Sequence, residues 1–425
     1  MSRFIIHGGR PLNGTFTPLG NKNAVLPMLA ACVLTDQPVT LKNVPWIDDV
    51  KVMLELLSSL GVDIRTRGRT LRLHAASLRE RRLDPALCGR VRSSILLAGP
   101  LTARHGGVTL SPPGGDVIGR RRLDTHFDGL ESLGIQVRAG ERYTLKRNRL
   151  KGADILLDEA SVTATENVMM AAVLAPGRTT LYNAACEPHV RDLGALLVKM
   201  GARIDGLGTN RLVIEGVKEL HGAEHAVQLD HIEIGSFAVA AAATGGSLRV
   251  RCGGNRESLR VIERALGRIG ATWKLRRGVL EVGSGGALQV HSDIGLAIPK
   301  IEDGPWPAFP SDLMSVAIVL ATQAAGSILF FEKMFESRMY FVDQLIAMGA
   351  RIVQCDPHRV LVSGPASLHG AHMATPDIRA GMALLIAALC ANGESIIEKA
   401  PIIDRGYERM DERLRALGAY IERAD

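Results

Sequence analysis

Leu60-Gly61-Val62 ends an amphipathic segment, and the same three-residue pattern recurs five more times along the chain. Each copy joins an apolar residue, a glycine and a small or branched apolar residue. The other copies are Leu133-Gly134-Ile135, Met200-Gly201-Ala202, Ile269-Gly270-Ala271, Met348-Gly349-Ala350 and Leu417-Gly418-Ala419. Successive glycines are 73, 67, 69, 79 and 69 residues apart. A unit of about 70 residues, repeated six times, is therefore the first prediction about the fold.

The residues around each glycine define the unit. Upstream of it lies a β-rich stretch, at residues 39–41, 108–110, 179–181, 248–250, 328–330 and 396–398. Further upstream most copies have a run that is apolar all round, which is typical of a buried helix. A glycine after a helix is typical of a left-handed C-cap, and alternating stretches such as 62–73 indicate hairpins. The unit is predicted as buried helix, strand, amphipathic helix, glycine stop and hairpin.

Six such units divide naturally into two groups of three. At 425 residues the chain is long enough for two domains. We predict an α/β protein with two domains of three βαβαββ-type repeats each. The first domain is expected at residues 21–230 and the second at 1–20 plus 231–425. The second includes the amino terminus because two short strands before Lys22 are expected to complete the sixth repeat, which lacks a hairpin.

Charged residues stand at the starts of the predicted buried helices. They are Lys22, Arg92, Glu166, Glu233, Asp312 and the pair Asp377 and Arg379. Helix N-termini carry unpaired amides and a partial positive charge, so they favour acids and anions. Ordinary first-turn stabilisation explains Glu166 and Glu233. The cations at these positions require anionic partners, which a convergent anion site would supply.

Composition restricts the class of ligand and the compartment. The net charge is +7, aromatic residues are only 4% and basic runs are short, so no nucleic-acid partner is expected. Arginine binds phosphate and carboxylate groups bidentately, so a multiply anionic small molecule fits better. The six cysteines lack metal-ligand spacing and indicate a reducing compartment. With no signal peptide and no uninterrupted apolar span, we expect a cytoplasmic protein without membrane contact, as a monomer or weak homo-oligomer.

A glycine-bracketed loop at residues 112–122, PPGGDVIGRRR, places one acid beside three arginines. Its glycines permit unusual dihedral angles, as a mobile lid requires. A surface loop with a local ion pair would show the same composition, and Asp312 could likewise be an ordinary first-turn acid.

Seven motifs make the chain resemble the UDP-N-acetylglucosamine enolpyruvyl transferases, over essentially its whole length. They are GNKNAVLP (20–27), GGDVIGRR (114–121), ATENVMMAAVLA (164–175), PAFPSD (307–312), FESR (335–338), TPDIRAG (375–381) and DRGYERMDERLRALGA (404–419). The resemblance implies the enolpyruvyl transferase fold, with each domain an inside-out α/β barrel and the active site in the cleft between domains. It also implies transfer of the enolpyruvyl group of phosphoenolpyruvate to a hydroxyl of UDP-N-acetylglucosamine, with release of phosphate, in peptidoglycan precursor synthesis. This chemistry needs an acid, a base and several cations, so no metal or redox cofactor is expected.

The resemblance also implies roles for individual residues. Asp116 matches the proton donor, and Asp312 matches the residue that contacts the acceptor hydroxyl and is the candidate base. Lys22, Arg121 and Arg405 match the residues that hold the phosphate and carboxylate of phosphoenolpyruvate. The remaining matches to substrate-binding residues are Asn23, Arg92, Ser161, Arg338, Arg379 and Asp377, the last expected to orient a neighbouring arginine.

Two kinds of departure from the family pattern affect these expectations. Asp116 replaces the usual cysteine, although aspartate occurs there in some functional members. A carboxylate attacks epoxides less well than a thiolate, so resistance to fosfomycin is expected. The other departures match the acceptor side and are Arg122, Thr125, Thr163, His231 and residues 313–315.

The acceptor-side departures leave two further interpretations open. The chain could be a paralogous enolpyruvyl transferase that acts on another nucleotide, such as UMP in nucleoside antibiotic biosynthesis. It could also be a paralogue that binds ligands without turnover. The presence of both Asp116 and Asp312 argues against the latter, because a protein that only binds needs neither an acid nor a base.

Overall fold

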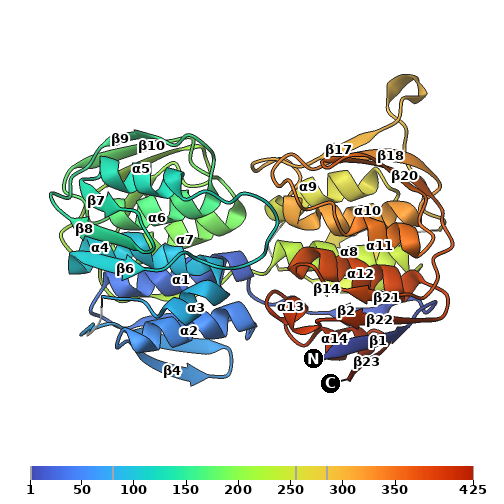
Figure 1. Ribbon diagram of the computed structural model, residues 1–425, viewed down its shortest axis with the longest axis horizontal. Helices are drawn as coiled ribbons and strands as arrows, with labels where there is room; N and C mark the ends of the chain where they lie inside the picture. Colours follow the sequence, from blue (N-terminus) through green and yellow to red (C-terminus); the bar gives the residue numbers. More distant parts are fainter. Residues whose placement is uncertain (1, 79–80, 254–255, 284–285, 425) are drawn as a thin grey trace. The chain divides into compact units, whose positions relative to one another are not determined.

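The chain forms two compact units (Figure 1). A computed structural model describes residues 2–78, 81–253, 256–283 and 286–424. Unit 1 consists of Met1–Leu19, Val117–Arg120 and Leu229–Asp425. Unit 2 consists of Gly20–Asp116 and Arg121–Gln228.

Buried helices form the centre of unit 2 and contact one another. They are α1 (Lys22–Ala31) with η1 (Cys32–Leu34), η2 (Arg92–Leu97) with α4 (Ala98–His105), and α6 (Val162–Ala172). Their side chains are buried nearly all round, as the apolar runs predicted. The other helices of the unit are α2 (Asp48–Ser59), α3 (Pro85–Arg90), α5 (Asp124–Ser132) and α7 (Pro188–Lys199).

The sheets of unit 2 are built to one plan, with a central strand between a parallel neighbour and a hairpin. Their strand orders are β13 (Glu224–Ala226), β3 (Val39–Lys42), β5 (Thr70–His74), β4 (Asp63–Arg67); β9 (Asp154–Leu156), β10 (Arg178–Tyr182), β12 (Arg211–Glu215), β11 (Arg203–Asp205); and β6 (Gly107–Leu110), β8 (Tyr143–Arg147), β7 (Ile135–Arg138). In the last of these, an isolated parallel bridge between Arg82 and Thr109 takes the place of the fourth strand.

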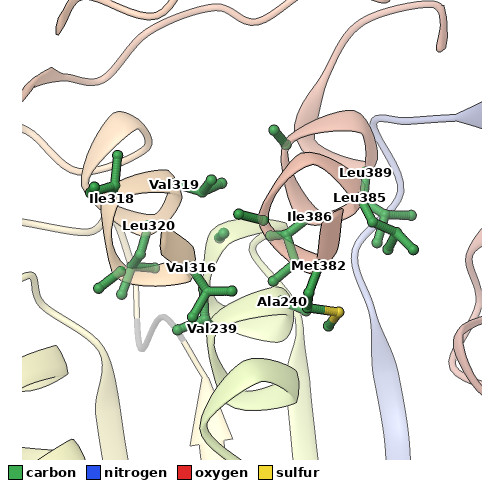
Figure 2. Packing of buried hydrophobic residues seen from close by; sticks show 14 of the residues in the cluster. Val239, Ala240, Val316, Ile318, Val319, Leu320, Met382, Leu385, Ile386 and Leu389 are labelled. Atoms are coloured by element: carbon green, nitrogen blue, oxygen red, sulfur yellow. The ribbon is translucent and has the colours of Figure 1, made fainter. Parts of the chain in front are cut away.

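Unit 1 repeats this arrangement. Its mutually contacting buried helices are α8 (His231–Ala243), η4 (Ser311–Leu313) with α10 (Met314–Thr322), and α12 (Ile378–Cys390). Figure 2 shows Ala240 of α8, Val316 of α10 and Met382 of α12 in one apolar cluster. The other helices are α9 (Arg256–Gly267), η3 (Ile294–Leu296), α11 (Val342–Ala347), α13 (Pro401–Asp404) and α14 (Met410–Arg415).

Both amino-terminal strands enter sheets of unit 1, but they enter different ones. The strand orders are β2 (Asn13–Phe16), β14 (Ser247–Arg251), β16 (Val279–Gly283), β15 (Thr272–Arg276); β17 (Lys300–Glu302), β18 (Gly326–Phe331), β20 (Arg359–Gly364), β19 (Ile352–Asp356); and β21 (His372–Ala374), β22 (Glu394–Glu398), β1 (Arg3–His7), β23 (Tyr420–Ala424). β1 lies antiparallel between β22 and β23, so it completes the sixth repeat as predicted.

The prediction was wrong for β2, which pairs in parallel with β14 of the fourth repeat. In the third, fifth and sixth repeats, the strand before the buried helix pairs with the strand after that helix. At β2 and β13, however, the chain passes to the other unit before its next buried helix begins. Each strand therefore pairs within the unit that the chain is about to leave. β13 pairs with β3 of the first repeat. The first and fourth repeats have thereby exchanged their first strands.

The glycine stops and the layering of the repeats are confirmed. Glycines 61, 134, 201, 270, 349 and 418 have φ values of 95°, 85°, 101°, 95°, 98° and 102°, as left-handed helix ends require. All six predicted β-rich stretches lie within strands. Helices lie inside and sheets outside in each unit, but the sheets of the described residues stay separate and close no barrel. No helix in the described ranges combines the length and apolar composition that a membrane span requires.

We expect Gly134→Ala to be more destabilising than Gly418→Ala. Both glycines have positive φ, a conformation that costs another residue about 1–3 kcal/mol. A Cβ at Gly134 would lie 2.0 Å from the Arg149 carbonyl oxygen, whereas at Gly418 the nearest atom would be 3.7 Å away. Urea unfolding followed by circular dichroism measures both losses. Equal losses would show that the backbone near Arg149 relaxes at little cost.

Candidate active site

Lys22 begins α1, and its ammonium group is paired inside unit 2. Lys22 Nζ lies 2.8 Å from Asp49 Oδ2 in the first turn of α2, and the two side chains are only 10% and 8% exposed. Asn21 caps the same helix by accepting a hydrogen bond from the Ala24 amide at 3.0 Å. The ion pair explains how a cation is tolerated at a helix start. Asn23 follows it and is half-buried.

Arg92 begins η2 and holds the returning end of the loop at residues 112–122. Its Nη2 donates to the carbonyl oxygens of Arg121 at 2.6 Å and Arg122 at 3.2 Å. Burial lowers the pKa of Arg92 to about 10, and the nearby Arg121 adds to this effect. The family-based assignment of Arg92 to acceptor binding stays a prediction, and the structure adds an anchoring contact to the loop backbone.

The loop itself divides between the two units. Asp116 is half-buried in unit 2, and Val117 beside it is 89% exposed. The tip, Val117–Arg120, belongs to unit 1. There Ser337 N donates to the Ile118 carbonyl at 3.1 Å, and Arg120 N donates to Glu336 Oε2 at 3.1 Å. Sequence reasoning assigned no role to Glu336, although it lies within the FESR motif.

Thr163, one of the acceptor-side departures, belongs to a polar network in unit 2. Its Oγ1 lies 3.0 Å from His126 Nε2, and His126 Nδ1 lies 3.1 Å from Asn167 Nδ2. Burial lowers the pKa of His126 to about 3, with a smaller effect of the same sign from Arg92, so its imidazole is neutral at pH 7. The network fixes the first turn of α6.

Ser161 and Thr125 flank this network. Ser161 is the N-cap of α6 and accepts a hydrogen bond from Ala164 N at 3.4 Å. Thr125 donates through Oγ1 to Asp158 Oδ1 at 2.5 Å. Ser161 thus caps α6, and Thr125 binds Asp158 in the segment that precedes it.

Asp312, in η4 of unit 1, lies between two buried arginines. Asp312 Oδ2 accepts a hydrogen bond from Arg379 Nη2 at 2.7 Å, and Oδ1 accepts one from Arg338 Nη2 at 3.2 Å. The carboxylate is 25% exposed, whereas the Arg338 and Arg379 side chains are 3% and 6% exposed. The acid therefore stays reachable while its cationic partners are enclosed.

A second set of contacts fixes Arg379. Its Nη1 donates to Tyr407 Oη at 3.1 Å, and that hydroxyl lies 3.0 Å from Ser236 Oγ. Asp377 caps α12 by accepting a hydrogen bond from Arg379 N at 2.9 Å, and its expected role in orienting an arginine stays a prediction. Burial opposes the charge of Arg379, but Asp312 and Tyr407 outweigh it and raise the pKa above its ordinary value. Tyr407 was missed by sequence reasoning, although it stands in the DRGYER motif.

Two more candidate positions lie in unit 1. Arg405 is half-buried at the C-cap of α13, directly after Asp404, whose carboxylate is held by Arg423 at 2.7 and 2.8 Å. His231 begins α8, and burial lowers its pKa to about 4, against the opposing effect of Asp312. Position 231 therefore holds a neutral ring at pH 7.

The structure thus brings some of the predicted residues into direct contact and gives others different partners. Asp312, Arg338 and Arg379 form one cluster, and Arg92 contacts the backbone of Arg121. Lys22 contacts Asp49, an acid that sequence reasoning did not select. Among the described side chains, no group of three or more His, Cys, Asp or Glu could hold a metal ion.

Comparison with known proteins covers nearly the whole chain. Residues 6–414 match the EPSP synthase (3-phosphoshikimate 1-carboxyvinyltransferase) family. The UDP-N-acetylglucosamine 1-carboxyvinyltransferase of Bradyrhizobium diazoefficiens is 55% identical, over 99% of this chain and 98% of its own. The one of Treponema denticola is 51% identical, over 99% of each. This chain belongs to the UDP-N-acetylglucosamine 1-carboxyvinyltransferase family.

Solved structures confirm the fold expected for this family. The enolpyruvyl transferase NikO from Streptomyces tendae has a TM-score of 0.89 at 25% identity, covering 100% of this chain and 99% of its own. EPSP synthase from Acinetobacter baumannii has a TM-score of 0.76 at 18% identity, covering 100% of both chains, and shows the fold alone. The resemblance inferred from the seven motifs is thereby confirmed.

Proposed function

We propose that this protein transfers the enolpyruvyl group of phosphoenolpyruvate to a hydroxyl of UDP-N-acetylglucosamine and releases phosphate, in peptidoglycan precursor synthesis. The supporting observation is full-length identity of 45% to 55% with relatives named UDP-N-acetylglucosamine 1-carboxyvinyltransferase. Another nucleotide acceptor, such as UMP, is the second candidate, because Thr125, Thr163 and His231 depart from the family pattern on the acceptor side.

In the proposed mechanism, cationic side chains bind phosphoenolpyruvate. Lys22, Arg121 and Arg405 neutralise its phosphate and carboxylate groups. Charge-assisted hydrogen bonds from such groups are strong, and they stabilise the phosphate as it leaves. The start of α1 adds positive potential from its backbone amides to that of Lys22.

Two carboxyl groups move the protons. Asp116 protonates carbon 3 of phosphoenolpyruvate while the acceptor hydroxyl attacks carbon 2 and gives its proton to Asp312. The tetrahedral adduct then returns a proton from carbon 3 to the Asp116 carboxylate and loses phosphate from carbon 2, which restores the double bond. Arg338 and Arg379 hold the Asp312 carboxylate in place and balance its charge.

A cytoplasmic location and a monomer or weak homo-oligomer complete the proposal. The cysteines of the described chain are all free, which supports a reducing compartment. Of these, Cys32, Cys88 and Cys252 are buried.

Phosphate release from phosphoenolpyruvate, measured with a panel of acceptors, tests the proposed function. We expect turnover with UDP-N-acetylglucosamine and none with UMP, UDP or UDP-glucose. Turnover with UMP but not with UDP-N-acetylglucosamine would establish the alternative acceptor. Binding of phosphoenolpyruvate without phosphate release for any acceptor would establish a protein that only binds.

We expect fosfomycin to leave the protein unmodified and to label Asp116→Cys. A thiolate attacks an epoxide carbon, the ring opens and the alkoxide takes up a proton, so the mass rises by one inhibitor molecule. A carboxylate at the same position is the weaker nucleophile. Intact-protein mass spectrometry measures the difference, with Asp116→Ser as an unreactive control. Stoichiometric labelling of Asp116 itself would refute the expectation.

A further inference from the structure

Two buried carboxyl groups, Asp303 and Glu332, lie next to the residues of the Asp312 cluster without belonging to it. They are 2% and 0% exposed. Asp303 follows β17 and Glu332 follows β18, and these strands pair in parallel. Asp303 Oδ1 accepts a hydrogen bond from Lys333 N at 2.5 Å, whereas its buried Oδ2 has no hydrogen-bond partner among the described residues. Two enclosed carboxylates with this little compensation would be costly if both were ionised.

Glu332 connects the two segments that carry Asp312 and Arg338. Ser311 Oγ lies 2.8 and 2.9 Å from the two carboxylate oxygens of Glu332 and donates its proton to them. Phe335 N donates to Glu332 Oε1 at 3.2 Å. Ser311 directly precedes Asp312, and Phe335 starts the turn that ends at Arg338. One carboxyl group thus joins the backbone segments on both sides of the Asp312–Arg338 contact.

A single proton makes this arrangement stable. Burial and the adjacent Asp303 together raise the pKa of Glu332 to about 9, against smaller lowering effects from Arg338 and Ser311. At pH 7 the two carboxyl groups therefore retain one proton between them. The proton turns the repulsion of two carboxylates into a hydrogen bond, and Asp303 Oδ2 is free to take part in it.

We propose that Asp303 and Glu332 form a proton-sharing pair whose function is to position Asp312 and Arg338 for catalysis. The inference rests on the proposed enolpyruvyl transfer. Neither member of the pair is assigned to a substrate. Both act through other residues, because the pair holds η4 and the segment after β18 at a fixed spacing.

Other charged groups surround the Asp303–Glu332 pair. Arg338 and Asp312 lie on its active-site side. Lys333 forms an ion pair with Glu302 at 3.1 Å on the exposed side, and His358 Nδ1 lies 2.7 Å from the Glu332 carbonyl oxygen. A change in activity at alkaline pH must therefore be assigned with a variant of the pair itself.

Glu332→Gln tests the shared proton. The glutamine amide can donate to Asp303 Oδ2 and still accept from Ser311, so it copies the protonated pair at every pH. We expect this variant to retain most of the wild-type kcat at pH 7. Wild-type kcat should fall as pH rises through about 9, because the second carboxylate ionises then, whereas kcat of Glu332→Gln should stay level. Glu302→Gln, which changes the exposed neighbouring acid, should keep the wild-type pH profile.

Glu332→Ala tests the positioning role. Loss of both connections should lower kcat by about 100-fold, the cost of a misplacement near 1 Å, while KM for both substrates changes little. Matching kcat values and pH profiles for wild type, Glu332→Gln and Glu332→Ala would overturn the inference. A wild-type protein that releases no phosphate would instead overturn the proposed function, so the two failures are distinguishable.

Thermal unfolding tests the pair without turnover. A carboxyl group whose folded pKa is raised binds a proton that the unfolded chain releases above its ordinary pKa. Its contribution to stability is complete below the unfolded pKa of about 4.5 and is lost as pH rises through about 9. The Tm of Glu332→Gln should therefore rise relative to that of the wild type as the pH is raised from 6 to 9. A constant difference in Tm would overturn the shared proton.

Discussion

Replacing Lys22 with alanine is expected to lower kcat/KM for enolpyruvyl transfer by about 100- to 1,000-fold, the usual cost of removing one group that stabilises developing negative charge. Lys22 is the first residue of α1, where unpaired backbone amides add positive potential. Phosphoenolpyruvate carries its charge on phosphate and carboxylate groups, and the phosphate gains charge as it leaves. Steady-state phosphate release at saturating acceptor measures the loss.

The same substitution also tests the buried ion pair. Lys22→Ala removes the cation that lies 2.8 Å from the buried Asp49 carboxylate, which should cost about 3–5 kcal/mol of unfolding free energy. Lys22→Ala/Asp49→Ala should regain much of that stability without regaining turnover. Lys51→Ala is the matched control, because Lys51 pairs with Asp48 on the exposed side of the same helix. If the double variant regained turnover, the role of Lys22 would be structural.

The architecture could be predicted because its strongest signal is local. The left-handed conformation after a helix favours glycine at that position, so the repeat is visible in the sequence itself. The exchange of β2 and β13 between repeats could not be predicted in this way. Both strands precede a buried helix, and nothing in their sequences indicates which sheet they join. Their pairing depends on where the chain passes from one unit to the other.

In the candidate site, too, the sequence identified individual residues but not the partners that they contact. Motifs selected Lys22, Asp312 and Arg379, but not Asp49 or Tyr407, to which two of these residues are bound. A signal for Asp49 was present, since Asp49 shares the buried face of α2 with Val52, Met53 and Leu56. An acid on the apolar face of a helix requires a cation.

Glu332 offered no comparable signal. It follows β18 in a segment whose polar sequence suggests exposure. Its burial results from the contact with Ser311 of η4. Contacts of this kind depend on pairs far apart in the sequence.

Asp312→Asn is expected to lower kcat by about 100- to 10,000-fold, the range for loss of a general base. Asparagine keeps the shape of the side chain but cannot accept the proton of the acceptor hydroxyl. KM for phosphoenolpyruvate should change little, because its anionic groups are bound by other cations. The variant also removes the carboxylate that Arg338 and Arg379 both contact, so some loss of stability should accompany the loss of kcat.

Glu233→Gln separates the two effects of the Asp312 substitution. Glu233 is an equivalent acid in the first turn of α8, where it binds Arg413 and accepts from Leu19 N at 2.8 Å. It is 5% exposed and has no role in the proposed transfer. Its substitution should therefore destabilise unit 1 without a matching loss of kcat, as thermal unfolding and phosphate release would show. If both variants lost kcat in proportion to stability, Asp312 would be a structural acid, and the base would have to be sought elsewhere.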